Sequence, residues 1–262
     1  MTDGLSQIVQ GPIRRAKSSS AACTGDKRHA RGQSTRELIL STAERLYAQF
    51  GISAVSLRDI ATAAGQKNNA AVHYHFGGKD NLVREIVLYR IESIKARANE
   101  IYPELLFGKK APQVADYVSA FVLPLECTID DGNYYLPFLS RYITEEGGIS
   151  SLMKAASSTG IDELRNGLSK ALPDYPESII EERWEIFGVS VIHSLAMYQT
   201  AHRAGTLAIP LDRLLEDLVR YHTAGLKAPW SEAGKPPRPA AKSRPQPGEA
   251  KAKKARAADT AA

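Results

Sequence analysis

The sequence predicts an all-α protein, and three observations carry that prediction. From residue 34 to residue 228 the apolar residues recur at the three- and four-residue spacing of helices, and no stretch alternates as a strand would. Glycine and proline interrupt this spacing and divide the chain into about nine helices. Hydrophobic residues make up 43% and charged residues 24% of the 262, which is the composition of an ordinary globular protein.

The first helix is predicted to begin at Ser34. Ser34-x-x-Glu37 has the pattern of a capping box, in which two side chains satisfy the free backbone amides of a helix start. Gly51 is predicted to end the helix, because glycine adopts the left-handed conformation without a steric penalty. One apolar stripe is expected to face the core, formed by Ile39, Ala43, Leu46 and Phe50.

Two short helices and a longer one follow. Ser56, with Asp59 three residues later, predicts a second helix over Leu57–Ala64, which Gly65 ends. The third is predicted over Asn69–Phe76, before the Gly77-Gly78 break. A longer helix then begins near Lys79 and is predicted to end at Pro103.

The remaining helices are longer and more apolar. Pro124 predicts a kink in one of them, and Gly205 and Pro210 separate the last two. Their predicted ranges are Val114–Ile129, Asn133–Glu146, Ile161–Leu172, Glu177–Arg203 and Leu211–Leu226.

The second and third helices, joined by a tight turn that contains Gly65, are typical of a helix-turn-helix. In such a motif one helix enters the major groove of DNA and the preceding helix holds it at a steep angle. The alternative is an αα-corner inside an ordinary helical domain, and spacing alone does not decide between the two.

The residues themselves resemble a known family over 34–95. The matching segments are Thr35-Arg36-x-x-Ile39-Leu40, Ser56-Leu57-Arg58-Asp59-Ile60-Ala61 and Tyr74-His75-Phe76-x-x-Lys79-Asp80, and they resemble the TetR (tetracycline-repressor-like) transcriptional regulators. The resemblance implies a homodimer with a three-helix DNA-binding domain at 34–95 and a helical effector-binding and dimerisation domain at 96–228. It also implies a repressor that a small-molecule effector releases from a pseudo-palindromic operator.

The resemblance assigns Ser56–Phe76 to the helix-turn-helix and Lys79 to a phosphate contact. The turn before the recognition helix is one residue longer than usual. The family's phosphate-contacting tyrosine is either replaced by His73 or has its role taken over by Tyr74. Capping remains an alternative role for both asparagines of this turn. The predicted DNA-binding residues are Thr35, Arg36, Ser56, Arg58, Lys67, Asn68, Asn69, His73, Tyr74 and Lys79.

Aromatic and polar residues of the second half are candidates for an effector pocket as a set, although each residue taken alone fits a simple core position better. They are Tyr117, Phe121, Tyr134, Tyr135, Phe138, Tyr142, His193 and Met197. A second apolar set is predicted to form a four-helix bundle between two subunits, with intrachain core as the alternative. That set is the stripe Ile180–Tyr198 with Leu211, Leu214, Leu215, Leu218 and Tyr221.

The net charge of +5 belongs to the two ends of the chain. Residues 1–33 and 229–262 are basic, carry little periodic hydrophobicity and are predicted to be disordered, whereas the 195 residues between them hold 20 basic and 24 acidic groups. A nonspecific or architectural DNA-binding protein that uses these basic ends is therefore a second hypothesis.

Other classes are excluded or disfavoured. No apolar stretch reaches the length of a membrane span, no secretory signal begins the chain, and two cysteines make no disulfide framework, so a cytoplasmic protein is expected. No phosphate-binding glycine loop, nucleophile elbow or His-Glu-x-x-His motif indicates an enzyme. No cofactor and no metal site are predicted, because His73 and His75 diverge on a helix.

Overall fold

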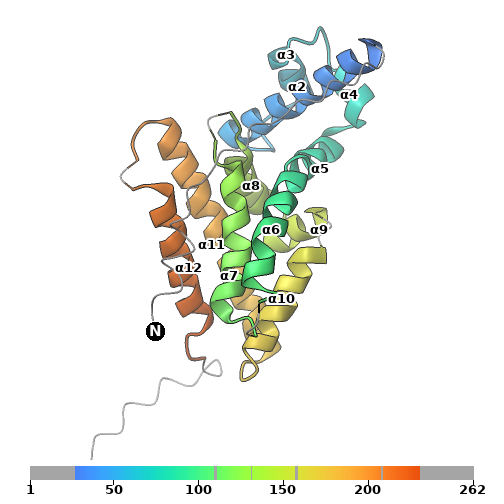
Figure 1. Ribbon diagram of the computed structural model, residues 1–262. Helices are drawn as coiled ribbons and strands as arrows, with labels where there is room; N and C mark the ends of the chain where they lie inside the picture. Colours follow the sequence, from blue (N-terminus) through green and yellow to red (C-terminus); the bar gives the residue numbers. More distant parts are fainter. Residues whose placement is uncertain (1–26, 109–110, 131, 157–158, 208, 231–262) are drawn as a thin grey trace, which may run out of the picture. The chain divides into compact units, whose positions relative to one another are not determined.

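Helices form every regular element of the described residues in this computed structural model (Figure 1), which confirms the predicted all-α class. The structure describes residues 27–230 apart from 109–110, 131, 157–158 and 208, and side chains from residue 34 onward except those of 155–159. The helices belong to one unit of the chain, which ends at Ala228. They are α2 (Lys27–Phe50), α3 (Leu57–Ala63), α4 (Ala70–Phe76), α5 (Lys79–Tyr89), α6 (Ile91–Leu105), α7 (Val114–Val122), the 3-10 helix η1 (Leu123–Thr128), α8 (Tyr135–Glu145), α9 (Gly148–Ala156), α10 (Thr159–Ala171), α11 (Glu177–Arg203) and α12 (Leu211–Leu226).

The start of the first helix is the clearest error of the sequence prediction. α2 begins at Lys27, so Ser34 and Glu37 lie inside it and form no helix cap. Residues 27–33, predicted to be disordered, are therefore helical, while residues 1–26 and 231–262 lie outside the described residues. A capping-box pattern specifies a helix start only where the preceding chain leaves the helical conformation.

Three other boundaries differ from the prediction. The long helix after Lys79 is broken at Arg90 and, as α6, continues past Pro103 to Leu105. The proline is tolerated because it removes only one backbone hydrogen bond near the helix end. Pro124 does not kink a continuous helix but lies at the start of η1. α9 was not predicted at all. The bounds of α11 and α12 agree with the prediction.

The side of α2 that faces the core also differs from the predicted stripe. Ile39 and Ala43 are buried as expected, but Phe50 is 63% exposed and Leu46 only partly buried. Leu40 and Tyr47 are buried in the core instead of Leu46 and Phe50. The buried face of the helix follows the helical period and does not select the most apolar residues.

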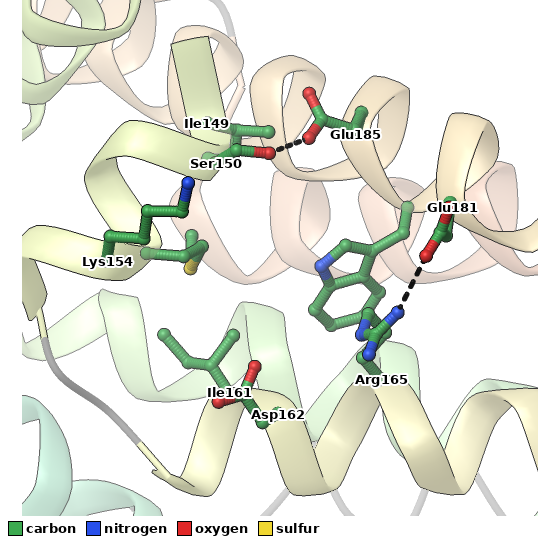
Figure 2. A pocket seen from close by; sticks show the side chains of 10 residues that line it. Ile149, Ser150, Lys154, Ile161, Asp162, Arg165, Glu181 and Glu185 are labelled. Carbon is green, nitrogen blue, oxygen red and sulfur yellow. Dashed lines mark hydrogen bonds and ion pairs between the residues drawn. The ribbon is translucent and has the colours of Figure 1, made fainter. Parts of the chain in front are cut away.

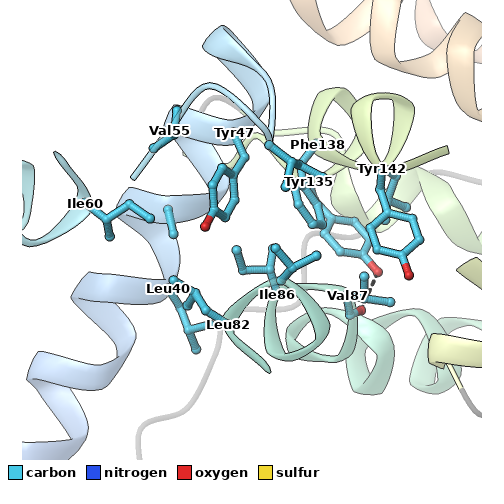
Figure 3. Close-up of a cluster of buried hydrophobic side chains, with 14 of the residues drawn as sticks. Leu40, Tyr47, Val55, Ile60, Leu82, Ile86, Val87, Tyr135, Phe138 and Tyr142 are labelled. Atoms are coloured by element: carbon cyan, nitrogen blue, oxygen red, sulfur yellow. Dashed lines mark hydrogen bonds between the residues drawn. The ribbon is translucent and has the colours of Figure 1, made fainter. Parts of the chain in front are cut away.

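One core cluster joins α2–α5 to α8 and α9 (Figure 3). Tyr47 of α2 and Phe138 of α8 are fully buried with ring centroids 6.3 Å apart, and the Tyr135 hydroxyl donates a 2.7 Å hydrogen bond to the Val87 carbonyl of α5. The helix-turn-helix region therefore shares its core with the helices that follow.

A second core cluster holds the long C-terminal helices. α11 and α12 lie side by side (Figure 1), and Trp184, Phe187 and Phe121 make aromatic contacts at 4.9–5.5 Å between ring centroids. Most of the stripe predicted to face a second subunit is buried here within the chain, at Ile180, Trp184, Phe187, Val191, Leu195, Leu215 and Leu218. For these residues the alternative prediction, intrachain core, is confirmed.

A buried polar bridge links α11 to α2. Gln199 donates hydrogen bonds to the carbonyls of Thr128, Asp130 and Asn133 at 3.1–3.2 Å, and Arg203 donates to the same Asn133 carbonyl. The next backbone amide in that segment, of Tyr134, donates to the Glu44 carboxylate of α2 at 2.6 Å. The segment before α8 is therefore fixed between the two helices.

The carboxyl of Glu44 is 1% exposed, and this burial raises its pKa above the ordinary 4.5 despite the Tyr134 amide and the nearby Arg90. Arg90 Nε lies 3.6 Å from Glu44 Oε2, which gives attraction without a hydrogen bond. Because the folded state holds this proton more tightly, the contribution of Glu44 to stability is complete below pH 4.5 and is lost as pH rises through the raised pKa.

Glu44→Gln is therefore expected to gain stability relative to the wild type as pH rises above about 4.5, because the amide keeps an acceptor for Tyr134 and cannot ionise. Urea unfolding between pH 4 and pH 8 measures the free-energy difference between the two proteins. Glu182→Gln, at an exposed position of α11, is the control and should show no such trend. A Glu44→Gln difference that is the same at every pH would contradict the assignment.

Among the described residues, no helix is both long enough and apolar enough to cross a bilayer. Nor do three His, Cys, Asp or Glu side chains of that part of the chain gather as metal ligands.

Candidate nucleic-acid interface

α3 begins as the sequence predicts. The Asp59 amide donates to Ser56 Oγ at 3.2 Å while the Ser56 amide donates to Asp59 Oδ2 at 2.9 Å, so the capping box is complete. The Ser56 hydroxyl also donates to Asp59 Oδ2 at 2.6 Å, and this hydrogen bond, together with that from the Ser56 amide, lowers the pKa of the Asp59 carboxyl. The predicted DNA contact at Ser56 thus has its side chain committed to the helix cap, whereas Arg58 is exposed on α3.

The turn between α3 and α4 is fixed by backbone hydrogen bonds. Gly65 adopts a φ of 68°, and the amides of Gly65 and Gln66 donate to the carbonyls of Thr62 and Ala61 at 3.1 and 2.8 Å. These bonds satisfy the last carbonyls of α3, as in a glycine-terminated helix. Residues 64–69 connect α3 to α4, and Lys67, Asn68 and Asn69 among them are exposed.

The two asparagines of the turn differ in role. Asn68 Oδ1 accepts a 3.0 Å hydrogen bond from the Ala70 amide, so Asn68 stabilises the start of α4. Asn69 is the N-cap residue by position, but its side chain makes no capping hydrogen bond. The amide group of Asn69 is therefore available for another partner.

α4 has one buried and one exposed face. Val72 and Phe76, one turn apart, are 0% and 5% exposed and hold the helix on the core. On the other side Tyr74 is 86% exposed and His73 is exposed beside it, with His73 Nδ1 3.4 Å from the Gly77 carbonyl oxygen. Four exposed polar residues of the turn and α4, here called the reading surface, are Lys67, Asn68, Asn69 and His73.

Arg36 and Lys79, both predicted to contact DNA, also hold the helices together. Arg36 pairs with Glu85 of α5, and its guanidinium lies 5.3 Å from the centroid of the Phe76 ring. Lys79 Nζ donates to the Ser53 carbonyl at 3.5 Å and lies 5.8 Å from the Tyr47 ring centroid. Thr35, on the same helix as Arg36, is partly buried.

The beginning of α5 offers a place for an anion. Lys79 is its first residue, and Gly78 supplies no side-chain cap, so the first amides of this eleven-residue helix keep their hydrogen-bonding capacity. Free amides and an ammonium group in one place attract a phosphate, although Asp80 in the same turn opposes it.

The eight residues predicted to line an effector pocket do not share one cavity. Tyr135, Phe138 and Tyr142 belong to the core cluster around α2, and Phe121 to the cluster around α11. Three others lie elsewhere: the Arg203 guanidinium stacks 3.8 Å from the Tyr134 ring centroid, Tyr117 packs against Gly167, and Met197 is 73% exposed. His193 is partly buried on α11. A cleft of about 480 Å³ lies instead between α9, α10 and α11, and none of the eight lines it.

Parts of this chain resemble known regulators. A sequence profile described as bacterial regulatory proteins, tetR family, matches residues 39–86. The HTH-type transcriptional regulator AcrR of Shigella flexneri is 46% identical over 54 residues, which are 21% of this chain and 25% of that protein. The match thus spans about a quarter of the relative's length.

Two solved structures align over longer stretches. One is a TetR-family transcriptional regulator from Bordetella parapertussis, with 19% identity, a TM-score of 0.49, and coverage of 71% of this chain and 93% of that one. The other is the fatty acid degradation regulator FadR from Bacillus halodurans, with 13% identity, a TM-score of 0.49, and coverage of 79% and 99%.

Proposed function

We propose that this chain is a sequence-specific DNA-binding transcriptional regulator of the tetR family, and the match of residues 39–86 to the profile of bacterial regulatory proteins, tetR family, supports the proposal. The observation that carries the proposal is the two-sided character of α4. Val72 and Phe76 are buried and hold α4 against the core. The reading surface lies on the turn and on the other side of α4 and is exposed to solvent. A helix presented in this way fits the major groove.

The chemistry of the reading surface suits base recognition. Asparagine pairs through two hydrogen bonds with adenine, and lysine with guanine, at the edges that the major groove displays. Asn69 is the stronger asparagine candidate because Asn68 already accepts the Ala70 amide. Arg58, Tyr74 and Lys79 flank this surface and are proposed to contact phosphate groups.

A homodimer is part of the proposal. Although most of the apolar stripe of α11 is buried within the chain, three large apolar side chains of α11 and α12 remain exposed. They are Ile186, Met197 and Tyr221, with exposures of 60%, 73% and 72%. Burying them against a second copy removes apolar surface from water, and two-fold symmetry then predicts a pseudo-palindromic operator.

We also propose that a small-molecule effector lowers operator affinity, so that the protein acts as a repressor. An effector acts by favouring a dimer geometry in which the two α4 helices no longer match successive major grooves. The packing of α8 and α9 against α2 and α5 offers a physical connection for such a change.

Selection of bound sequences from random duplex DNA, with the full chain, tests the proposal. Enrichment of a two-fold symmetric site with half-sites about one helical turn apart is the expected result. The basic ends favour a rival hypothesis of nonspecific binding, in which no sequence is enriched and affinity follows salt concentration alone. Removal of residues 1–26 and 231–262 should then abolish binding under the rival hypothesis, but leave the sequence preference under ours.

A further inference from the structure

The cleft between α9, α10 and α11 has the size of a small-molecule site (Figure 2). Its volume of about 480 Å³ lies within the range of about 300–1,000 Å³ that is usual for such sites. Ile149 and Met153 of α9 and Trp184 of α11 give it an apolar wall. Its charged residues are Lys154 of α9, Asp162 and Arg165 of α10, and Glu181 and Glu185 of α11.

The charges of the cleft do not balance. Arg165 lies 3.3 Å from Glu181 and 3.5 Å from Glu177, so its charge is already compensated. Glu185 accepts a hydrogen bond from Ser150, and Lys154 of α9 also lines the cleft (Figure 2). Within the described part of the chain, no ion pair joins Glu185 or Asp162 to a cation. Three carboxylates, of Asp162, Glu181 and Glu185, and two cations, of Lys154 and Arg165, line the cleft, so its lining carries one excess negative charge beside apolar surface.

Trp184 adds an unused donor to this wall. Its side chain is 6% exposed and packs against Phe121 and Phe187, with 5.5 Å between ring centroids in both pairs. The indole N–H makes no hydrogen bond with any described residue and is not among the fully buried polar atoms. A ligand in the cleft can accept a hydrogen bond from this N–H, and the face of the indole ring also attracts cations.

We infer that this cleft binds a small organic cation, with an ammonium group near Asp162 and Glu185 and an apolar body against Ile149, Met153 and Trp184. The excess of carboxylates over cationic groups in the lining disfavours an anion, and a neutral molecule of the same shape gains nothing from this charge. As an effector site the cleft rests on the proposed function, whereas cation binding itself is independent of it.

The cleft is placed to influence the DNA-binding helices. Ile149 and Leu152 of α9 belong to the same core cluster as Leu82 and Ile86 of α5, and α9 packs directly on α5. A ligand held between α9 and α11 thus acts on a helix that supports the start of α5 and, through it, α4.

Fluorescence of Trp184 reports on binding directly. The chain has two tryptophans, so Trp230→Phe leaves Trp184 as the single reporter in the full-length protein. Three probes of equal chain length, octylammonium, octanol and octanoate, are titrated at neutral pH. Saturable fluorescence change with octylammonium, and with neither of the others at the same concentration, is the expected result. Equal responses to all three probes would overturn the inference.

Two variants locate the site. Asp162→Asn with Glu185→Gln in the same chain should weaken octylammonium binding about two- to fivefold per replaced carboxylate. The control Glu182→Gln removes the same charge from an exposed position of α11 outside the cleft and should leave the affinity unchanged. Unchanged affinity in the double variant, or an equal loss in the control, refutes the site. A protein that enriches no DNA sequence but still binds octylammonium selectively refutes the proposed function alone.

Discussion

Sequence-selective DNA binding is expected to disappear when the four residues of the reading surface are replaced together by alanine: Lys67, Asn68, Asn69 and His73. Each good contact to a base edge contributes about 1–3 kcal/mol of discrimination, so the affinity for the selected site should fall at least about a hundredfold. Affinity for random-sequence DNA should change much less, because phosphate contacts outside the reading surface remain. Fluorescence anisotropy with both DNAs, at one salt concentration, measures the two losses.

Two controls separate recognition from folding. Asn68 supports the start of α4, so a triple variant that keeps Asn68 removes base contacts without the capping loss of about 0.5–2 kcal/mol. Lys170→Ala, at an exposed lysine of α10, matches the charge change of Lys67→Ala and should leave DNA binding intact. Retention of the original sequence preference in the triple and quadruple variants would show that the bases are read elsewhere.

Phe138→Ala is expected to destabilise the helix-turn-helix region and the helices after it together. Phe138 is fully buried, and its ring centroid lies 6.3 Å from that of Tyr47 and 6.2 Å from that of Tyr142. Removing a buried phenyl ring leaves a cavity and costs about 3–5 kcal/mol. Because one core cluster includes residues of α2, α5 and α8, a single unfolding transition should shift for the whole unit that ends at Ala228.

Urea unfolding followed by circular dichroism and by operator binding measures this effect. The matched control is Phe107→Ala, which removes the same ring from a position that is 76% exposed and should cost less than about 0.5 kcal/mol. Two separate transitions, only one of which moves in Phe138→Ala, would contradict a shared core.

Local patterns were sufficient for much of the helix-turn-helix. The Ser56–Asp59 capping box and Gly65 fix the ends of α3 through contacts within a few residues, so the sequence predicts them. The same logic failed at Ser34, where the helix continues upstream, and at Arg90, where no glycine or proline marks the break between α5 and α6.

Long-range contacts explain the remaining differences. Glu44 looks like a surface residue in the sequence, but the segment before α8 covers it and supplies the Tyr134 amide. Tyr135 and Phe138 have the spacing of either a pocket or a core, and only their contacts with Val87 and Tyr47 decide for the core. The cleft escaped prediction because Met153, Asp162 and Trp184 come from three different helices and share no motif.

Operators with modified purines test most directly whether α4 and its turn read DNA through the major groove. Replacing each half-site purine by its 7-deaza analogue removes the N7 acceptor in the major groove, whereas replacing guanine by hypoxanthine removes only a minor-groove amino group. We predict that the 7-deaza operator loses at least about tenfold in affinity, and that the hypoxanthine operator binds almost as the unmodified one does. Unchanged affinity for the 7-deaza operator together with a loss on the hypoxanthine operator would contradict the role assigned to the reading surface.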